Sequence, residues 1–122
     1  MEYGSKKYLF MGDYEPIKEN NPQYRKIDWE PVDVLKVAHH GSSANLIDGF
    51  FETVRPDYAI ISAGENAKWN FPNDETIKAL KAVQKEPPID ILVTRYEKKT
   101  IIVISDGNNI KIEKDSTIVD GN

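Results

Sequence analysis

The pattern that most constrains the fold of this sequence is an alternation of short apolar runs with segments of helical periodicity. Strand-like runs occupy residues 7–11, 32–38, 58–63 and 89–94, and helical patterns occupy residues 46–54 and 74–83. The runs have the length and the β-branched content of strands, whereas the other segments repeat apolar side chains every three or four residues. This alternation predicts an α/β fold in which helices flank a mixed β-sheet. Residues 100–105 and 110–113, joined by an Asp-Gly-Asn-Asn turn, predict a hairpin at the end.

The size of the chain predicts one domain. With 122 residues, of which 39% are hydrophobic, the sequence is long enough for one core and too short for two ordinary domains. We therefore expect a single domain over residues 1–122, with a long loop at residues 14–31 where Pro16, Pro22 and Pro31 interrupt regular structure.

The composition excludes several classes of protein. There is no cysteine, so neither a disulfide framework nor a thiolate metal site can form. The formal charge of −4 argues against a generally basic nucleic-acid binder, although a local site acting on phosphodiesters remains compatible with it. No apolar run approaches the length of a membrane span or of a signal peptide, so we expect a soluble chain whose cellular location is open.

Polar residues with metal-binding chemistry follow three of the predicted strands. The first strand ends in Gly12-Asp13, the second in His39-His40-Gly41-Ser42, and the third in Gly64-Glu65-Asn66. The two histidines are the only ones in the chain. Because ligands collect beyond the carboxyl ends of strands in α/β sheets, a carboxylate and imidazoles there suggest a site for zinc, manganese or iron.

Each of these residues also has a simpler interpretation. Asp13 after glycine is typical of an ordinary turn, and an exposed histidine pair would be unremarkable. Ser42 is a possible nucleophile, but it equally suits a helix cap, and no Gly-x-Ser-x-Gly motif surrounds it. Trp69, Phe71 and Tyr96 suggest a wall for stacking a substrate, or simple packing in the case of Phe71.

The spacing of these motifs resembles a known family. Residues 9–13 (LFMGD), 32–42 (VDVLKVAHHGS) and 55–66 (RPDYAIISAGEN) resemble the carboxy-terminal half of a metallo-β-lactamase-fold hydrolase. The closest similarity is to the hydrolase domain of ComEC-type competence proteins, which take up DNA. This resemblance covers roughly residues 5–104 and implies half of an αββα sandwich.

The resemblance also implies roles for particular residues. Asp13 matches the aspartate that bridges two divalent metal ions, Zn or Mn, in the complete domain. His39, or alternatively His40, matches a metal-binding histidine. His40 and Ser42 would then be the catalytic residues that face the substrate phosphate or orient a ligand. A phosphodiester or nucleic acid is the implied substrate, attacked by hydroxide held at the metal site.

Two departures from the family limit what the chain should do alone. The family's Asn-x-x-x-x-His-Pro segment is present as residues 66–72, with Phe71 in place of the polar residue. The family's principal motif, His-x-His-x-Asp-His, belongs to an amino-terminal half that does not match this sequence. We therefore expect an isolated chain that is inactive, binds metal weakly or not at all, and either associates with itself or pairs with the missing half through an exposed sheet face.

Two interpretations from other classes remain open. The chain could be a non-catalytic α/β interaction module derived from the same scaffold, which the Phe71 replacement and the shortage of histidines favour. A small acidic nucleic-acid adaptor is a third possibility, weakened by the absence of a basic stripe in the sequence.

Overall fold

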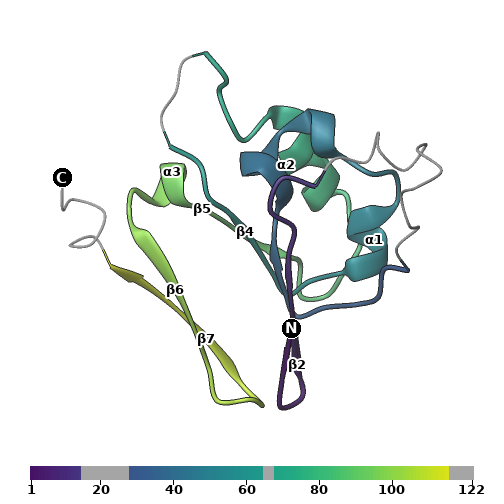
Figure 1. Cartoon of the computed structure of the whole chain (residues 1–122), viewed down its shortest axis with the longest axis vertical. Coiled ribbons are helices and arrows are strands. Elements are labelled where there is room, and N and C mark those ends of the chain that lie inside the picture. The colour runs from purple at the N-terminus through teal and green to yellow at the C-terminus, as the bar shows by residue number, and fades with distance from the viewer. Residues whose placement is uncertain (15–27, 65–67, 116–122) are drawn as a thin grey trace.

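The computed structural model describes residues 1–14, 28–64 and 68–115. The elements are arranged around one five-stranded sheet with the spatial order β1-β2-β3-β4-β5, and a separate two-stranded sheet is formed by β6 and β7 (Figure 1). The strands of the larger sheet are β1 (Glu2–Tyr3), β2 (Lys6–Phe10), β3 (Val34–Lys36), β4 (Tyr58–Ile61) and β5 (Asp90–Val93). Strands β2 to β5 are parallel and β1 is antiparallel to β2, so the chain is an α/β protein with a mixed sheet, as predicted.

Helices cover one face of this sheet. They are α1 (Phe50–Val54) and α2 (Asp74–Lys81), which lie on the same side of the sheet in Figure 1. The single turn α3 (Thr94–Glu97) directly follows β5 and does not belong to this layer. The longest of them, α2, has 8 residues, and within the described parts of the chain no helix could cross a bilayer.

The core lies between the sheet and these two helices. Strand register places the side chains of four neighbouring strands in one row on the helical face, because side chains alternate between faces along each strand. That row consists of Leu9, Leu35, Ala59 and Ile91. Apolar side chains of α1 and α2 pack against it, and Leu35, Val54 and Leu80 are almost completely buried there.

The opposite face of the sheet is covered unevenly. Tyr8 and Val34 share that face and are buried, whereas Phe10, two residues beyond Tyr8, is 63% exposed. The hairpin of β6 (Thr100–Ser105) and β7 (Ile110–Asp115) lies on this side in Figure 1. Its turn touches the β1–β2 turn, where the amide of Ser5 donates to the carbonyl of Gly107 at 2.6 Å.

Several element boundaries differ from the sequence prediction. The helix expected over residues 46–54 begins only at Phe50, because Gly49 adopts a left-handed conformation at its amino end. The strand expected over residues 32–38 is limited to Val34–Lys36. The short elements β1 and α3 were not predicted, since two to four residues carry no measurable periodicity. Of the loop expected at residues 14–31, residues 15–27 lie outside the described part of the chain.

Candidate functional site

Three strand ends meet around the histidine pair. The amide of His39, just after β3, donates to the carbonyl of Gly12 at 2.8 Å, which brings the end of β2 alongside. The ring of His40 reaches Ser62, just after β4, with 2.6 Å between Nδ1 and the Ser62 carbonyl. The parallel sheet therefore assembles the segments that the sequence singled out, with the exception of Glu65 and Asn66, which lie outside the described residues.

The backbone of the histidine pair has an unusual conformation. His39, His40 and Gly41 have consecutive φ angles of 45°, 56° and 78°, in the left-handed region that costs a non-glycine residue about 1 kcal/mol. Such a turn persists only where its surroundings determine it. Here the carbonyl of Gly41 accepts two bonds, from the Thr76 hydroxyl at 2.8 Å and from the Asn73 amide at 3.0 Å, so the start of α2 holds the turn in place.

Hydrogen bonds fix which ring nitrogen of each histidine carries the proton. Because the partner of His40 Nδ1 is a carbonyl oxygen, which only accepts, that nitrogen must donate. His39 Nδ1 lies 3.0 Å from Oδ1 of the buried Asn45, whose Nδ2 donates to the Tyr14 carbonyl at 2.5 Å. Asn45 thus presents its oxygen to His39. In its neutral form each ring is therefore the Nδ1–H tautomer, with the lone pair on Nε2, which is the arrangement seen when histidine binds a metal through Nε2.

This arrangement gives a prediction for Asn45. Replacing Asn45 by alanine removes the acceptor at His39 Nδ1, so the ring of His39 should shift toward the Nε2–H tautomer that predominates in free neutral imidazole, while His40 keeps its own. Two-dimensional ¹⁵N spectra of the ring nitrogens at a pH where both rings are neutral measure this. Unchanged His39 shifts in Asn45→Ala would contradict the assignment, and His40 in the same spectrum is the internal control.

Asp13 is exposed, and the charge that it influences most clearly is that of Lys36. Burial lowers the pKa of Lys36, and the nearby Asp13 carboxylate partly opposes this shift. Across the described residues, no three side chains among histidine, cysteine, aspartate and glutamate come together in a way that could hold a metal ion. The described residues alone therefore do not make up a complete metal site, and the ligand roles of Asp13 and His39 stay predictions.

Ser42 has the geometry of a cap. Its side chain is 8% exposed, and Oγ accepts from the amide of Ala44 at 3.3 Å at the start of the short 3-10 segment Ser43–Asn45. This is the simpler of the two interpretations that the sequence left open.

An aromatic row lies beside the histidines. Phe71 stacks between His40 and Trp69, with ring centroids 6.2 and 6.1 Å away and interplanar angles of 20° and 15°. Tyr96 is 60% exposed and is not in ring contact with this row in the described structure. Of the three aromatic residues that the sequence singled out, Trp69 and Phe71 lie together beside His40 and Tyr96 lies apart, while a role in stacking a substrate stays a prediction.

Sequence reasoning missed three residues that shape the site. Asn45 orients His39, while Thr76 and Asn73 fix the turn, the latter also accepting the Ser43 amide at its Oδ1 at 2.8 Å. Asn73 stands directly before α2, but its side chain makes no capping bond to that helix. Thr76 lies four positions before Leu80, so the helical pattern places this polar residue on the apolar side of α2. That placement is the sequence signal that could have identified it.

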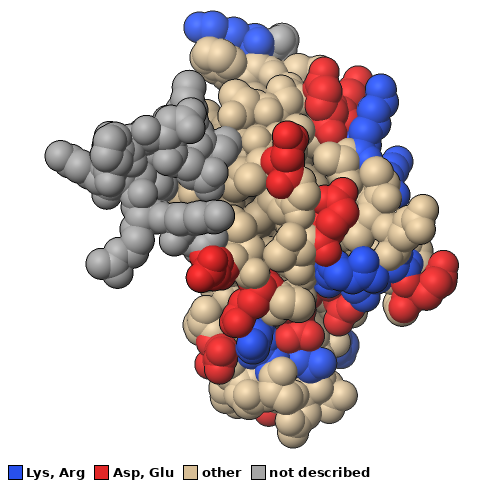
Figure 2. Space-filling view, turned by 90° about the vertical axis from the view of Figure 1, so that its right-hand side faces the viewer, with Lys and Arg blue, Asp and Glu red and all other residues tan. Residues whose placement is uncertain are grey.

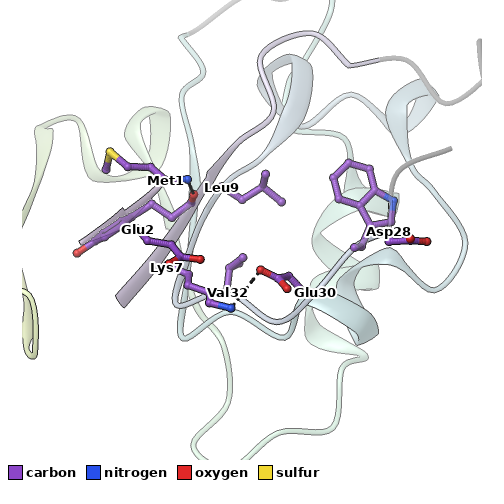
Figure 3. Close-up of a pocket in the computed structure, with 9 residues that line it drawn as sticks. Met1, Glu2, Lys7, Leu9, Asp28, Glu30 and Val32 are labelled. Carbon is purple, nitrogen blue, oxygen red and sulfur yellow. Dashed lines mark hydrogen bonds and ion pairs between the residues drawn. The ribbon is translucent and has the colours of Figure 1, made fainter. Parts of the chain in front are cut away.

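A pocket of about 220 Å³ lies elsewhere, beside the start of β2 (Figure 3). Its lining includes Lys7 and Glu30, which form an ion pair at 3.1 Å, and contains neither histidine. Acidic and basic side chains are interspersed on the helical side of the molecule, and those drawn in Figure 2 form no continuous basic stripe. Neither feature competes with the histidine turn as a site for chemistry.

Comparison with known proteins finds two much longer relatives, each of which contains a segment similar to this chain. The chain is 34% identical over 82 residues to "ComE operon protein 3" of Bacillus subtilis (strain 168), which covers 66% of this chain and 10% of that protein. It is 36% identical over 77 residues to "Recombination protein 2" of Haemophilus influenzae (strain ATCC 51907 / DSM 11121 / KW20 / Rd), covering 63% of this chain and 9% of that protein. No protein-family profile and no solved structure matches the sequence. The chain therefore spans about a tenth of the length of the curated relatives it matches, and its similarity to a ComE protein agrees with the resemblance noted in the sequence.

Proposed function

We propose that this chain forms the carboxy-terminal part of a metal-dependent hydrolase domain in a DNA-uptake protein, with a metallo-β-lactamase-like half-sandwich fold. The DNA-uptake setting comes from the resemblance to ComEC-type competence proteins, and the similarity to ComE operon protein 3 agrees with that resemblance. The observation that carries the proposal is the histidine turn, because a strained backbone and two fixed tautomers present Nε2 of both His39 and His40 at the carboxyl edge of a parallel sheet.

In this proposal the chain supplies only part of the site. His39 and Asp13 would hold divalent metal together with ligands from another segment, and the metal would supply a hydroxide for phosphodiester hydrolysis. His40, whose ring is exposed and held by the Ser62 carbonyl, would face the substrate. Ser42, buried as a cap, would act by fixing the turn rather than by touching substrate.

The proposed partner is the missing half of the domain. On the sheet face opposite the helices, Phe10 leaves one large apolar side chain 63% exposed. Burying such a side chain contributes about 2 kcal/mol to association, so this face is where we expect the complementary half to pack.

Metal titration tests the proposal. Calorimetry with Zn²⁺ or Mn²⁺ should show weak binding by the 122-residue chain that His39→Ala and Asp13→Ala both abolish. Asp48→Ala, which removes an exposed carboxylate away from the strand ends, is the matched control and should bind as the unchanged chain does.

A second experiment supplies the metal ligands that we expect from another segment. The chain is co-expressed with the segment of ComE operon protein 3 that precedes the matched 82 residues, and cleavage of single- and double-stranded DNA is measured with Mn²⁺. Cleavage that disappears with His39→Ala supports the proposal. Absence of metal binding both alone and in the mixture overturns it.

A non-catalytic interaction module is the second candidate. It is favoured by Phe71, whose apolar ring lies against His40 in the position where the related family has a polar residue. A folded mixture of the two halves that binds no metal would support this candidate.

A further inference from the structure

The three stacked rings beside the histidine turn form an exposed row. Trp69 is 54% exposed, Phe71 is half-buried and His40 is exposed, so both outer rings of the row are open to solvent. Parallel rings about 6 Å apart are within the range in which aromatic groups interact. A tryptophan that is half exposed and held at a fixed angle loses less side-chain freedom when a ligand stacks on it than a free surface residue would.

The row is fixed to the fold at two points. Arg95 Nη1 donates to the Phe71 carbonyl at 3.0 Å and to Asn70 Oδ1 at 2.9 Å, which ties the loop to α3. Pro72 lies against Gly41, where a Cβ atom would come within 2.6 Å of the Pro72 side chain. The rings therefore keep their place relative to His39 and His40.

Two cations accompany the rings. Lys68 Nζ lies 4.8 Å from the centroid of the Trp69 ring, and Arg95 donates to the backbone carbonyl of Phe71. A flexible lysine over an exposed indole can move to a phosphate when a flat ring takes its place on the indole. Asp74 and Glu75 begin α2 a few residues further on, so the local charge nearly balances and binding has to depend mainly on stacking.

We propose that the row of Trp69, Phe71 and His40 is a stacking platform for unpaired bases of single-stranded nucleic acid. Aromatic platforms bind single strands because every base offers a π-face, and duplexes hide those faces. The platform would direct a single strand past the histidine turn. This inference names the ligand of the proposed site, but it rests on ring geometry and needs no metal, so either proposal can fail alone.

Fluorescence anisotropy of a labelled oligo(dT) of about 12 nucleotides tests the platform at low salt. The 122-residue chain should bind it, and Trp69→Ala should weaken binding about tenfold, as expected for the loss of one stacked base. Trp69→Phe, which keeps a flat ring, should recover most of the affinity. Tyr96→Ala removes an equally exposed aromatic ring outside the row and should bind as the unchanged chain does.

Two further probes separate stacking from charge. An abasic oligonucleotide of the same length, and a duplex, should each bind about as weakly as oligo(dT) binds Trp69→Ala. If Lys68 and Arg95, the two cations that the described residues place at the row, each contact one phosphate, the slope of log affinity against log salt should be about −1.4. Equal binding of oligo(dT), abasic strand and duplex would overturn the proposal.

Other results would also overturn it. If no oligonucleotide binds, or if Tyr96→Ala loses as much affinity as Trp69→Ala, the row is not a base platform. If Trp69→Ala instead abolishes self-association in sedimentation without changing oligonucleotide binding, the exposed indole belongs to a protein contact. Absence of metal binding both by the chain alone and by the co-expressed mixture, with oligo(dT) binding intact, would reject only the hydrolase proposal.

Discussion

Replacing Gly41 by alanine should lower the free energy of unfolding by about 3 kcal/mol. Gly41 has a φ angle of 78°, which costs alanine about 1 kcal/mol, and the added Cβ would lie 2.6 Å from the Cβ of Pro72. Relieving that overlap requires moving the backbone of a loop fixed by other contacts, at a cost of about 2 kcal/mol. Urea denaturation followed by circular dichroism measures the loss.

Gly49→Ala is the matched control for this substitution. Gly49 has a φ angle of 74°, but a Cβ atom there would meet nothing within 4 Å. The Gly49→Ala variant should therefore lose only the cost of the left-handed backbone, about 1 kcal/mol of unfolding free energy. Equal losses at the two glycines would show that the contact between Gly41 and Pro72 does not constrain the turn. The ring signals of His40 should shift in Gly41→Ala and stay in place in Gly49→Ala.

Replacing Leu35 by alanine should destabilise the fold by about 3 kcal/mol and lower the melting temperature by about 10 °C. Leu35 is fully buried at the centre of β3, in the row that packs against α1 and α2. Removing its side chain leaves a cavity that neighbouring strands, held by hydrogen bonds on both sides, cannot close.

Leu46→Ala serves as the comparison, because Leu46 is only partly buried at the margin of the same core. Its loss should be about 1 kcal/mol, since less apolar surface is returned to water and the site can relax. Thermal and urea unfolding of both variants provide the measurement. A Leu35→Ala loss no larger than that of Leu46→Ala would contradict the placement of the core.

The sequence was sufficient to predict strands β2 to β5, because each coincides with a distinct apolar run. The apolar run ending at Ala38 identified β3, and the pattern of Ile77, Leu80 and Val83 identified α2, although the true bounds are shorter. Hydrophobic pattern records which face is buried, and burial extends beyond the residues that make ladder hydrogen bonds. This explains why the strands expected at residues 32–38, 58–63 and 89–94 are shorter in the structure. Apart from β1 and α3, strands and helices follow one another along the chain as predicted, whereas the order of strands within the sheet was not predicted.

The site was less predictable because its geometry depends on distant partners. The sequence correctly indicated that His39 and His40 follow a strand, but it could not show that Asn45 orients one ring or that Thr76 holds the turn from 35 residues away. Such pairings follow from the tertiary structure, not from local propensity. The same is true of Phe71, which was considered mainly as a packing residue and lies half-exposed in an aromatic row.

The contact between the two turns has a consequence for how the molecule folds. Ser5 and Gly107 are separated by 102 positions, yet the Ser5 amide is bound to the Gly107 carbonyl. Closing so long a stretch of chain is entropically costly, so we expect this bond to form late, once the strands that carry the two turns have taken their places. Amide hydrogen exchange at Ser5 should therefore report the completion of the whole fold, with protection at this one position appearing last during refolding.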